Sequence, residues 1–152
     1  MGGQIINEED FIQKEEEVIV DEKGGNEIKT EKITINGINI PLYKEKYETT
    51  QDFVKKLMKL LYKNNFIPDN EIKNLLNKDY CNETFDVPFP IFQNDPKMLL
   101  DRKGHSRYWS NKVIGDFYIC SQWWKQKEKI YDEKLAKWIL KISKYNVKTN
   151  GI

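Results

Sequence analysis

An alternation of isoleucine and polar residues around Asn36-Gly37 constrains the fold more than any other feature of this chain. From Lys32 to Leu42 the sequence reads KITINGINIPL. Asn-Gly supplies the two positive φ angles that a two-residue hairpin turn requires, and the alternation gives each strand one apolar face. The sequence therefore predicts a β-hairpin that buries one face, formed by Ile33, Ile35, Ile38 and Ile40.

Three segments with the apolar period of a helix follow this hairpin. The first is capped by Thr49 or Thr50 and ends near residues 64–65. The second begins at Pro68-Asp69 and ends by about residue 78, and the third runs from about residue 130 to 145. Each has one apolar face, so we expect all three helices to pack on the sheet.

Proline and aromatic residues separate the second helix from the third. Pro88 and Pro90 are incompatible with a central strand, so residues 80–93 are predicted to form an extended, packed loop. Residues 107–110 and 117–124 then suit a second hairpin. The order ββααββα predicts a small α+β fold, in which two antiparallel hairpins pack with about three helices in one domain of residues 32–148.

Charge divides the chain into two parts. Residues 1–31 hold ten acidic residues and three lysines, a net charge of −7, and predict an acidic flexible tail or linker. Residues 32–152 carry a net charge of +8, and 13 of their Lys and Arg residues lie in residues 96–152 beside five acidic residues. The carboxy-terminal part is therefore the electropositive part of the protein.

Several function classes are disfavoured by composition. The longest apolar runs are only a few residues, which argues against a membrane span or signal peptide, so we expect a cytoplasmic protein. Cys81, Cys120 and a single histidine cannot fill a four-ligand zinc site, and both cysteines are predicted to be reduced structural thiols. No phosphate-binding glycine loop is present, and no cofactor is expected.

Catalysis has few candidate residues. His105 is the one histidine, and histidine is the side chain that titrates near neutral pH, but the sequence spacing supplies no nucleophile beside it. Asp101 and Asp116 offer carboxylates for a metal, without the Asp-X(n)-Glu-X-Lys arrangement of many nucleases. The sequence favours a protein that is not an enzyme, and a metal-dependent nuclease that uses Asp101, His105 and Asp116 stays open as an alternative.

The positive signals are electrostatic and aromatic. Both arginines of the chain lie between residues 102 and 112, among hydrogen-bonding and aromatic side chains, and arginine suits phosphate groups and guanine edges. Lysines recur every three or four residues on the last helix, beside its apolar face. Of Trp123 and Trp124, one is expected in the core with Trp138 and the other outside. The predicted nucleic-acid contacts are Arg102, Lys103, His105, Arg107, Lys112, Lys134, Lys137, Lys141 and Lys144, with Trp109 and Trp124 as aromatic contacts.

Three stretches of the chain resemble a poorly characterised bacterial accessory domain. They are Arg107-Tyr108-Trp109-Ser110, the FYICSQWW sequence of residues 117–124 and the LAKWI sequence of residues 135–139. Such domains occur alone or attached to restriction-type or GIY-YIG-like nucleases and mobile-element proteins, and the similar stretch runs from about Ile33 to Ile142. The resemblance implies an accessory role in a bacterial or mobile-element system and supplies no catalytic residue.

Two functions fit these observations. The first is a nucleic-acid-binding accessory domain without catalytic activity, with DNA as the favoured partner, in which lysine and arginine contact phosphates and an exposed aromatic residue stacks. The second is a protein-interaction or inhibitory module of a bacterial or phage conflict system, in which an outward tryptophan and tyrosines form the binding surface. Salt dependence distinguishes them, because phosphate contacts weaken steeply as salt rises.

Overall fold

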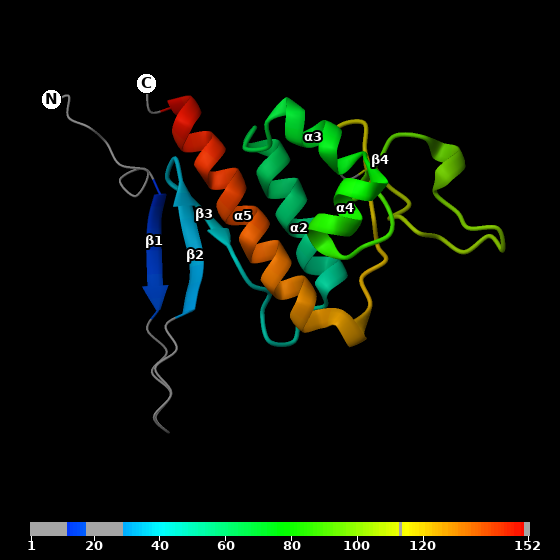
Figure 1. Ribbon diagram of the computed structural model, residues 1–152, viewed down its shortest axis with the longest axis horizontal. Coiled ribbons are helices and arrows are strands. Elements are labelled where there is room, and N and C mark those ends of the chain that lie inside the picture. Colours follow the sequence, from blue (N-terminus) through cyan, green and yellow to red (C-terminus); the bar gives the residue numbers. More distant parts are fainter. Residues whose placement is uncertain (1–11, 18–28, 113, 151–152) are drawn as a thin grey trace, which may run out of the picture.

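The computed structural model describes the backbone of residues 12–17, 29–112 and 114–150 and the side chains of residues 31–112 and 114–146. These residues form an α+β fold, which confirms the predicted class (Figure 1). A three-stranded antiparallel sheet lies to one side of the helices, and a two-stranded sheet lies among the loops. The sheets contain β1 (Ile12–Glu17), β2 (Lys29–Ile35) and β3 (Ile38–Pro41), and β4 (Phe92–Gln93) and β5 (Tyr118–Ile119); the helices are α2 (Thr50–Lys63), α3 (Asp69–Leu75), α4 (Lys78–Phe85) and α5 (Glu128–Asn150).

The predicted first hairpin is confirmed. Asn36 and Gly37 have φ angles of 50° and 81°, as the two-residue turn between β2 and β3 requires. Ile33 lies opposite Ile40 in the ladder, and both are fully buried. Ile35 is buried as well, whereas its partner Ile38 is half-buried at the turn. The hairpin therefore contributes one apolar face to the core.

The acidic amino-terminal segment is not a tail throughout. β1 pairs antiparallel with β2, with Ile12 opposite Ile35 and a register shift between Glu15 and Glu16. An unpaired strand edge offers free N–H and C=O groups, and β1 satisfies those of β2. The prediction of a tail over residues 1–31 is therefore wrong for residues 12–17 and 29–31, and its remainder lies outside the described residues.

Helix α2 forms where the sequence predicts it. The Thr49 hydroxyl caps the helix by accepting a hydrogen bond of 3.2 Å from the backbone N–H of Asp52. Asn64 ends it, and its side-chain amide donates to the carbonyl of Leu60 at 2.8 Å. The buried face of α2 packs into the core with residues that include Phe53 and Leu57.

Helix α4 replaces the first half of the predicted extended loop. Asn77 caps the helix, because its side-chain oxygen accepts the N–H of Tyr80 at 2.9 Å. Asp86 ends it in the left-handed conformation, with φ of 62°. Pro88 and Pro90 come only after this end, so they do not oppose the helix. The fold consequently has four α-helices in its described residues, where the sequence predicts about three.

The second sheet also differs from its prediction. β5 pairs with β4, Phe92 opposite Ile119, and residues 107–109 lie antiparallel to residues 119–121 through two backbone hydrogen bonds of 2.9 Å, from Trp109 to Ile119 and from Ser121 to Arg107. Tyr108 contributes only an isolated bridge to Cys120, and its hydroxyl donates to the Pro90 carbonyl at 2.7 Å. The fully buried Phe92 places β4 beside β5 as a partner that the sequence did not predict.

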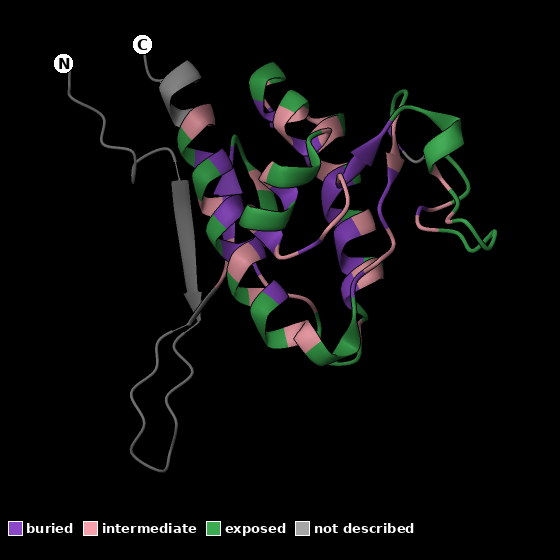
Figure 2. Cartoon of the chain, turned by 45° about the vertical axis from the view of Figure 1, so that its right-hand side comes forward, coloured by how far each residue is buried: buried purple, intermediate pink, exposed green. Residues whose placement is uncertain are grey.

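Aromatic side chains fill the centre of the helical part of the core, where Figure 2 shows the buried inner faces of the helices. Phe85 contacts Trp138 with a centroid distance of 5.5 Å and Trp123 with 6.2 Å, and Trp123 contacts Tyr131 at 5.0 Å. Trp124 is 45% exposed, so one member of the tryptophan pair points outward, as expected. Both tested predictions about the tryptophans of residues 123, 124 and 138 are confirmed.

Both cysteines are free and buried, as predicted. Burial raises the pKa of the Cys81 thiol to about 12 and that of Cys120 to about 12. A thiol with so high a pKa is protonated at neutral pH and is a poor nucleophile. Cys81 and Cys120 therefore serve as packing residues of the core.

Candidate functional site

A groove between α4 and α5 brings together four of the predicted contact residues. Its volume is about 680 Å³. The carboxy-terminal helix contributes most of the wall, and α4 contributes the remainder. We call it the lysine groove; it is lined by Tyr80, Glu83, Thr84, Lys134, Lys137, Trp138, Leu140, Lys141 and Lys144.

Helical spacing places these lysines on one side of α5. Lys134, Lys137, Lys141 and Lys144 are three or four residues apart, so they follow one face of the helix. A neighbouring face carries the buried residues Leu135, Trp138, Ile139 and Ile142. One helix thus supplies both a core face and a cationic face, and the groove lies where the cationic face meets α4.

A buried carboxylate lies beneath the groove. Glu71 of α3 is 0% exposed, and three side chains donate hydrogen bonds to it. The indole N–H of Trp138 is 2.7 Å from Oε2, the hydroxyl of Tyr80 is 2.5 Å from the same oxygen, and the amide of Asn74 is 3.1 Å from Oε1. A buried carboxylate is tolerated only when its oxygens are satisfied in this way.

Lys141 connects this carboxylate to the groove surface. Its amino group donates to the Tyr80 hydroxyl at 3.0 Å and lies 3.8 Å from Glu71 Oε1. The hydrogen bond with Tyr80 raises the pKa of Lys141 above the usual 10.5, partial burial opposes this, and the charge of Glu71 adds to it. Burial also raises the pKa of the Tyr80 phenol above 10.0, and its bond to Glu71 acts in the same direction. At neutral pH a charged Lys141 donates to a neutral Tyr80, which donates to Glu71.

The other three lysines of the groove make fewer contacts with the protein than Lys141 does. Lys134 donates to the backbone carbonyl of Glu83 at a long 3.4 Å. Lys137 and Lys144 are exposed, and within the described part of the chain neither forms a hydrogen bond or ion pair. Glu83 is the acidic residue in the lining, against four lysines. Among the described residues, the groove therefore has excess positive charge in its lining.

The loop from residue 99 to 112 holds the other predicted cations. Asp101 organises its turn: one carboxylate oxygen accepts the backbone N–H groups of Lys103 and His105, both at 2.8 Å, and the other lies 3.2 Å from His105 Nδ1. The backbone hydrogen bond from His105 is the main cause that lowers the pKa of Asp101 below 3.8. Arg102, Lys103 and His105 are exposed around this turn.

Arg107 and Lys112 lie against aromatic rings of the same region. The Arg107 guanidinium carbon is 4.7 Å from the centroid of the Phe89 ring, and Lys112 Nζ is 5.7 Å from that of Tyr118. Such contacts hold the cations near the surface of the protein without neutralising their charge. Both side chains remain able to contact an anion.

Trp109 occupies a more enclosed position than a stacking platform needs. It is half-buried, and the amino group of Lys55 lies 4.3 Å from its ring centroid. Its indole nitrogen is buried and has no hydrogen-bond partner among the described residues. One ring face is thus covered by Lys55, while Trp124, 45% exposed, keeps a larger accessible surface, with Lys127 5.2 Å from its centroid.

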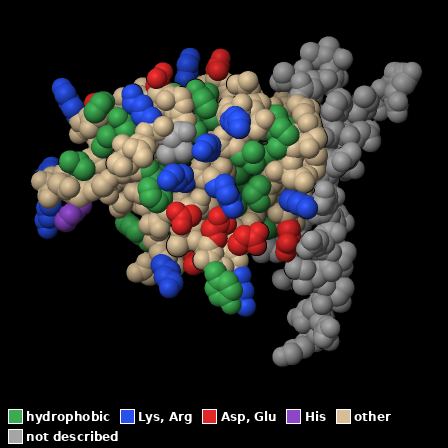
Figure 3. Space-filling view, turned by 180° about the vertical axis from the view of Figure 1, so that it is seen from behind, with side chains coloured by type: hydrophobic (Ala, Val, Ile, Leu, Met, Phe, Trp, Pro, Cys, Tyr) green, Lys and Arg blue, Asp and Glu red, His purple; other side chains and the backbone are tan. Residues whose placement is uncertain are grey.

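The structure does not join the two predicted groups of cations into one surface. Figures 1 and 2 both show the loop around η1 (Pro96–Met98) projecting from the side of the molecule opposite the carboxy-terminal half of α5. The view from behind shows a further group of Lys and Arg side chains, with Asp and Glu side chains directly beside it (Figure 3). On α2, for example, Lys56 pairs with Glu48 at 2.8 Å. The lysine groove differs by its low content of acid.

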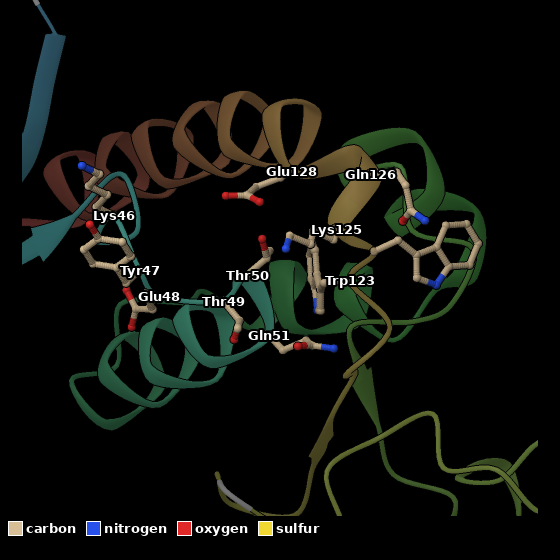
Figure 4. Close-up of a pocket in the computed structure, with 11 residues that line it drawn as sticks. Lys46, Tyr47, Glu48, Thr49, Thr50, Gln51, Trp123, Lys125, Gln126 and Glu128 are labelled. Atoms are coloured by element: carbon tan, nitrogen blue, oxygen red, sulfur yellow. The ribbon is translucent and has the colours of Figure 1, made fainter.

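A second pocket, of about 560 Å³, lies between the start of α2 and residues 123–128 (Figure 4). In this view the side chains of Thr50, Lys125 and Glu128 point toward a common space, and Tyr47 lies at one side. Tyr47 is 89% exposed and Trp124, which also lines the pocket, is 45% exposed. Acidic and basic residues are balanced in the lining, with Lys46 and Lys125 against Glu48 and Glu128.

Neither a metal site nor a membrane span emerges from the described residues. No three His, Cys, Asp or Glu side chains in that part of the chain come together as metal ligands, and Asp116 does not join the Asp101–His105 pair. None of the described helices is long and apolar enough to cross a bilayer.

The sequence did not predict the residues of α3 and α4 that line the groove or lie beneath it. Glu71, Tyr80 and Thr84 belong to segments predicted as a short helix and a loop, and none was a candidate. One signal was available: Glu71 lies four residues before the buried Leu75, on the apolar face of α3. A carboxylate at such a position needs buried donors, which Tyr80 and Trp138 provide.

Comparison with known proteins adds no relative. No family model matches the chain, and neither a curated protein nor a solved structure matches it.

Proposed function

We propose that the protein is a nucleic-acid-binding domain without catalytic activity, that DNA is its partner, and that the lysine groove holds the sugar-phosphate backbone. One observation carries the proposal: four lysines line a single groove that contains one acidic residue, Glu83. Phosphate contacts by lysine supply most of the affinity of nonspecific nucleic-acid binding. An accessory domain that positions a partner enzyme on DNA needs no more chemistry than this.

The spacing of the cations suits a polyanion better than a single anion. Lys134 and Lys144 are ten residues apart. Because a helix rises 1.5 Å per residue, the row of lysines is about 15 Å long. A row of that length meets several phosphates of one nucleic-acid strand, because each strand of duplex DNA carries one charge per about 3.4 Å of the axis. A small anion would occupy only part of the row.

The loop cations are proposed as a second, weaker contact. Arg102, Lys103, His105, Arg107 and Lys112 lie apart from the groove, so they meet phosphates at a different place on the partner. The exposed face of Trp124 offers aromatic contact. These residues add to the affinity of the groove without forming one surface with it.

The test is fluorescence anisotropy of a labelled duplex DNA over a range of salt concentrations. Binding to four phosphates gives a plot of log affinity against log salt with a slope of about −3.6. The Lys137→Gln/Lys144→Gln variant removes two exposed lysines of the groove that have no ion-pair partner among the described residues. We therefore expect a slope less negative by about 1.8 and an affinity at low salt that is roughly tenfold lower.

A matched control separates this site from general charge. Lys59 and Lys63 are exposed lysines of α2, so the Lys59→Gln/Lys63→Gln variant changes the net charge by the same amount. We expect the control to bind nearly as well as the unaltered protein. Equal losses in both variants would contradict a role for the groove, and no binding of DNA at low salt would refute the proposed function.

A protein-interaction or inhibitory module is the second candidate, and the pocket of Figure 4 favours it. Two exposed aromatic residues, Tyr47 and Trp124, line that pocket, and exposed aromatic side chains are common anchors of protein interfaces. Its lining has no excess of positive charge, so a partner bound there would stay bound at salt concentrations that release DNA from lysines. A Trp124→Ala variant that loses a partner captured at high salt supports this role.

A further inference from the structure

The lysine groove has an apolar floor that phosphate binding alone does not require. Leu140 and Tyr80 line it and are half-buried, so part of each side chain faces the groove. Trp138 closes it from below and is 1% exposed. Exposed apolar surface in a concave, positively charged site indicates that the ligand brings an apolar face as well as negative charge.

The two strands of a duplex do not offer such a face to a groove of this shape. In a duplex the bases are stacked inside, and the phosphates form the outer surface. A duplex would therefore meet the lysines at the rim and leave the floor unfilled. A single strand can turn a base toward the protein, and proteins that bind single strands combine a cationic groove with side chains on which bases stack.

The lysines at the rim can contact the phosphates of a single strand, and the apolar floor can contact a base. Lys137 and Lys144 are seven residues apart, which is about 10.5 Å along α5, and Leu140 lies between them in sequence. Lys141 Nζ lies 5.3 Å from the centroid of the Tyr80 ring, so a cation also borders the aromatic part of the floor. The groove volume of about 680 Å³ is in the range of sites that enclose a small molecule.

We propose that the lysine groove binds single-stranded nucleic acid in preference to duplex. Lys137 and Lys144 contact phosphates on either side of one nucleotide, whose base packs on Leu140 and Tyr80. This inference rests on the proposed function of the same groove and names its ligand. DNA and RNA strands share the chemistry it uses, a phosphodiester chain with accessible bases.

The buried network beneath the floor supports this assignment. Glu71 fixes the Tyr80 hydroxyl at 2.5 Å and the Trp138 indole at 2.7 Å. Both rings therefore keep one orientation before any ligand arrives. A floor that is already ordered loses less conformational entropy when a base packs on it.

The experiment compares four labelled ligands of equal length on the full chain: a 12-nucleotide thymidine strand, the matching uridine strand, an abasic strand that keeps every phosphate, and a 12-base-pair duplex. We expect the thymidine strand to bind roughly tenfold more tightly than the abasic strand, because stacking on one base is worth about that factor. The duplex is expected to bind no better than the abasic strand. The uridine strand reports whether RNA is an equal or better ligand.

Variants then assign the two contributions to residues. Leu140→Ala shortens the floor, so it should weaken the thymidine strand several-fold and leave the abasic strand unchanged, whereas Leu140→Met keeps an apolar surface and should retain binding. Lys137→Gln/Lys144→Gln should weaken all four ligands. Thermal unfolding of each variant verifies that it is folded.

The outcomes separate this inference from the proposed function. Equal affinity for thymidine strand, abasic strand and duplex, all lost in the lysine variant, would overturn single-strand recognition and leave nucleic-acid binding in place. Absence of binding to all four ligands at low salt would overturn both. Weaker binding of Leu140→Ala to the abasic strand as well as to thymidine would also contradict a base on the floor.

Discussion

The lysine groove and the loop of residues 99–112 carry similar numbers of cations but hold them in different ways. In the groove, Lys141 bonds to Tyr80 at 3.0 Å, and Tyr80 bonds to the fully buried Glu71. In the loop, the turn is held by Asp101 through backbone N–H groups, and Arg102 and Lys103 extend into solvent. In the groove a fully buried carboxylate thus supports a cation directly, whereas in the loop Asp101 supports the backbone of the turn.

This difference matters for binding because ordering a flexible side chain costs free energy. Each long side chain that a ligand immobilises costs roughly 0.5–1.5 kcal/mol, and a side chain that is already fixed avoids part of this cost. Lys141 is fixed in the groove, whereas Arg102 and Lys103 must be ordered by the ligand. Equal charge in the two regions is therefore expected to give unequal affinity.

The largest expected effect in this comparison is that of removing the carboxylate beneath the groove. Glu71→Ala leaves the Trp138 indole N–H without its acceptor and the Tyr80 hydroxyl and Lys141 without their carboxylate partner. We expect a loss of about 3–5 kcal/mol in the free energy of unfolding, as for other broken buried charge networks. At 2–4 °C per kcal/mol this lowers Tm by on the order of 10 °C, measured by calorimetry.

The conservative variant shows whether the charge or the shape of Glu71 is needed. Glu71→Gln keeps one carbonyl oxygen whose two lone pairs can accept from both Trp138 and Tyr80, but its NH2 group replaces the oxygen that accepts from Asn74 and faces Lys141. Its stability should fall between that of the unaltered protein and that of Glu71→Ala. A Glu71→Ala protein as stable as the original would show that the groove has no more support than the loop.

The elements that a sequence pattern specifies locally were predictable. The Asn36-Gly37 hairpin, the Thr49 cap and the row of lysines on α5 each depend on residues close in sequence, and the structure has all three. Strand β1 and the pairing of β4 with β5 depend on partners far along the chain, which spacing does not reveal. Helix α4 was missed because Pro88 and Pro90 favoured an extended loop over residues 80–93, and the cap at Asn77 was not recognised.

The sequence predicted the lysines of the candidate site but not the buried residues that support them. Its lysines follow a visible period, but Glu71 acts on Lys141 across 70 residues and through Tyr80, which no local pattern connects. Trp109 shows the converse: its aromatic type suggested a stacking surface, and the fold covers a ring face with Lys55. Residue type predicts which chemistry is possible, and packing decides whether the group is accessible.

Tyr80→Phe is the next test and has a smaller effect. The loss of one hydroxyl removes the link between Lys141 and Glu71, at a cost of about 1–2 kcal/mol in the free energy of unfolding. The pKa values of Lys141 and Tyr80 are both raised in the folded protein, so their contribution is full below about pH 10 and is lost as the pH rises above it. In urea unfolding, the unaltered protein should lose stability between pH 9.5 and 11.5 more steeply than Tyr80→Phe.

Neutralisation of the loop is expected to have a weaker effect on DNA binding than that of the groove. Arg102→Gln/Lys103→Gln removes two exposed cations, the same change in charge as Lys137→Gln/Lys144→Gln. We expect a loss of two- to threefold in affinity at low salt, measured by anisotropy, because these two cations lie apart from the row of four lysines that is proposed to hold the backbone. If this variant loses more affinity than the groove variant, the main contact is on the loop and the ranking of the two regions is reversed.

The smallest expected effect concerns the turn itself. The pKa of Asp101 is lowered, first by the N–H of His105, so the ionised carboxylate stabilises the turn above about pH 4 and this stabilisation is lost as the pH falls further. Because the turn lies in an exposed loop, Asp101→Ala should leave Tm almost unchanged. It should speed the hydrogen exchange of the Lys103 and His105 amides, the two groups that bond to the carboxylate at 2.8 Å. A large drop in Tm would show instead that the loop is coupled to the core as tightly as the groove is.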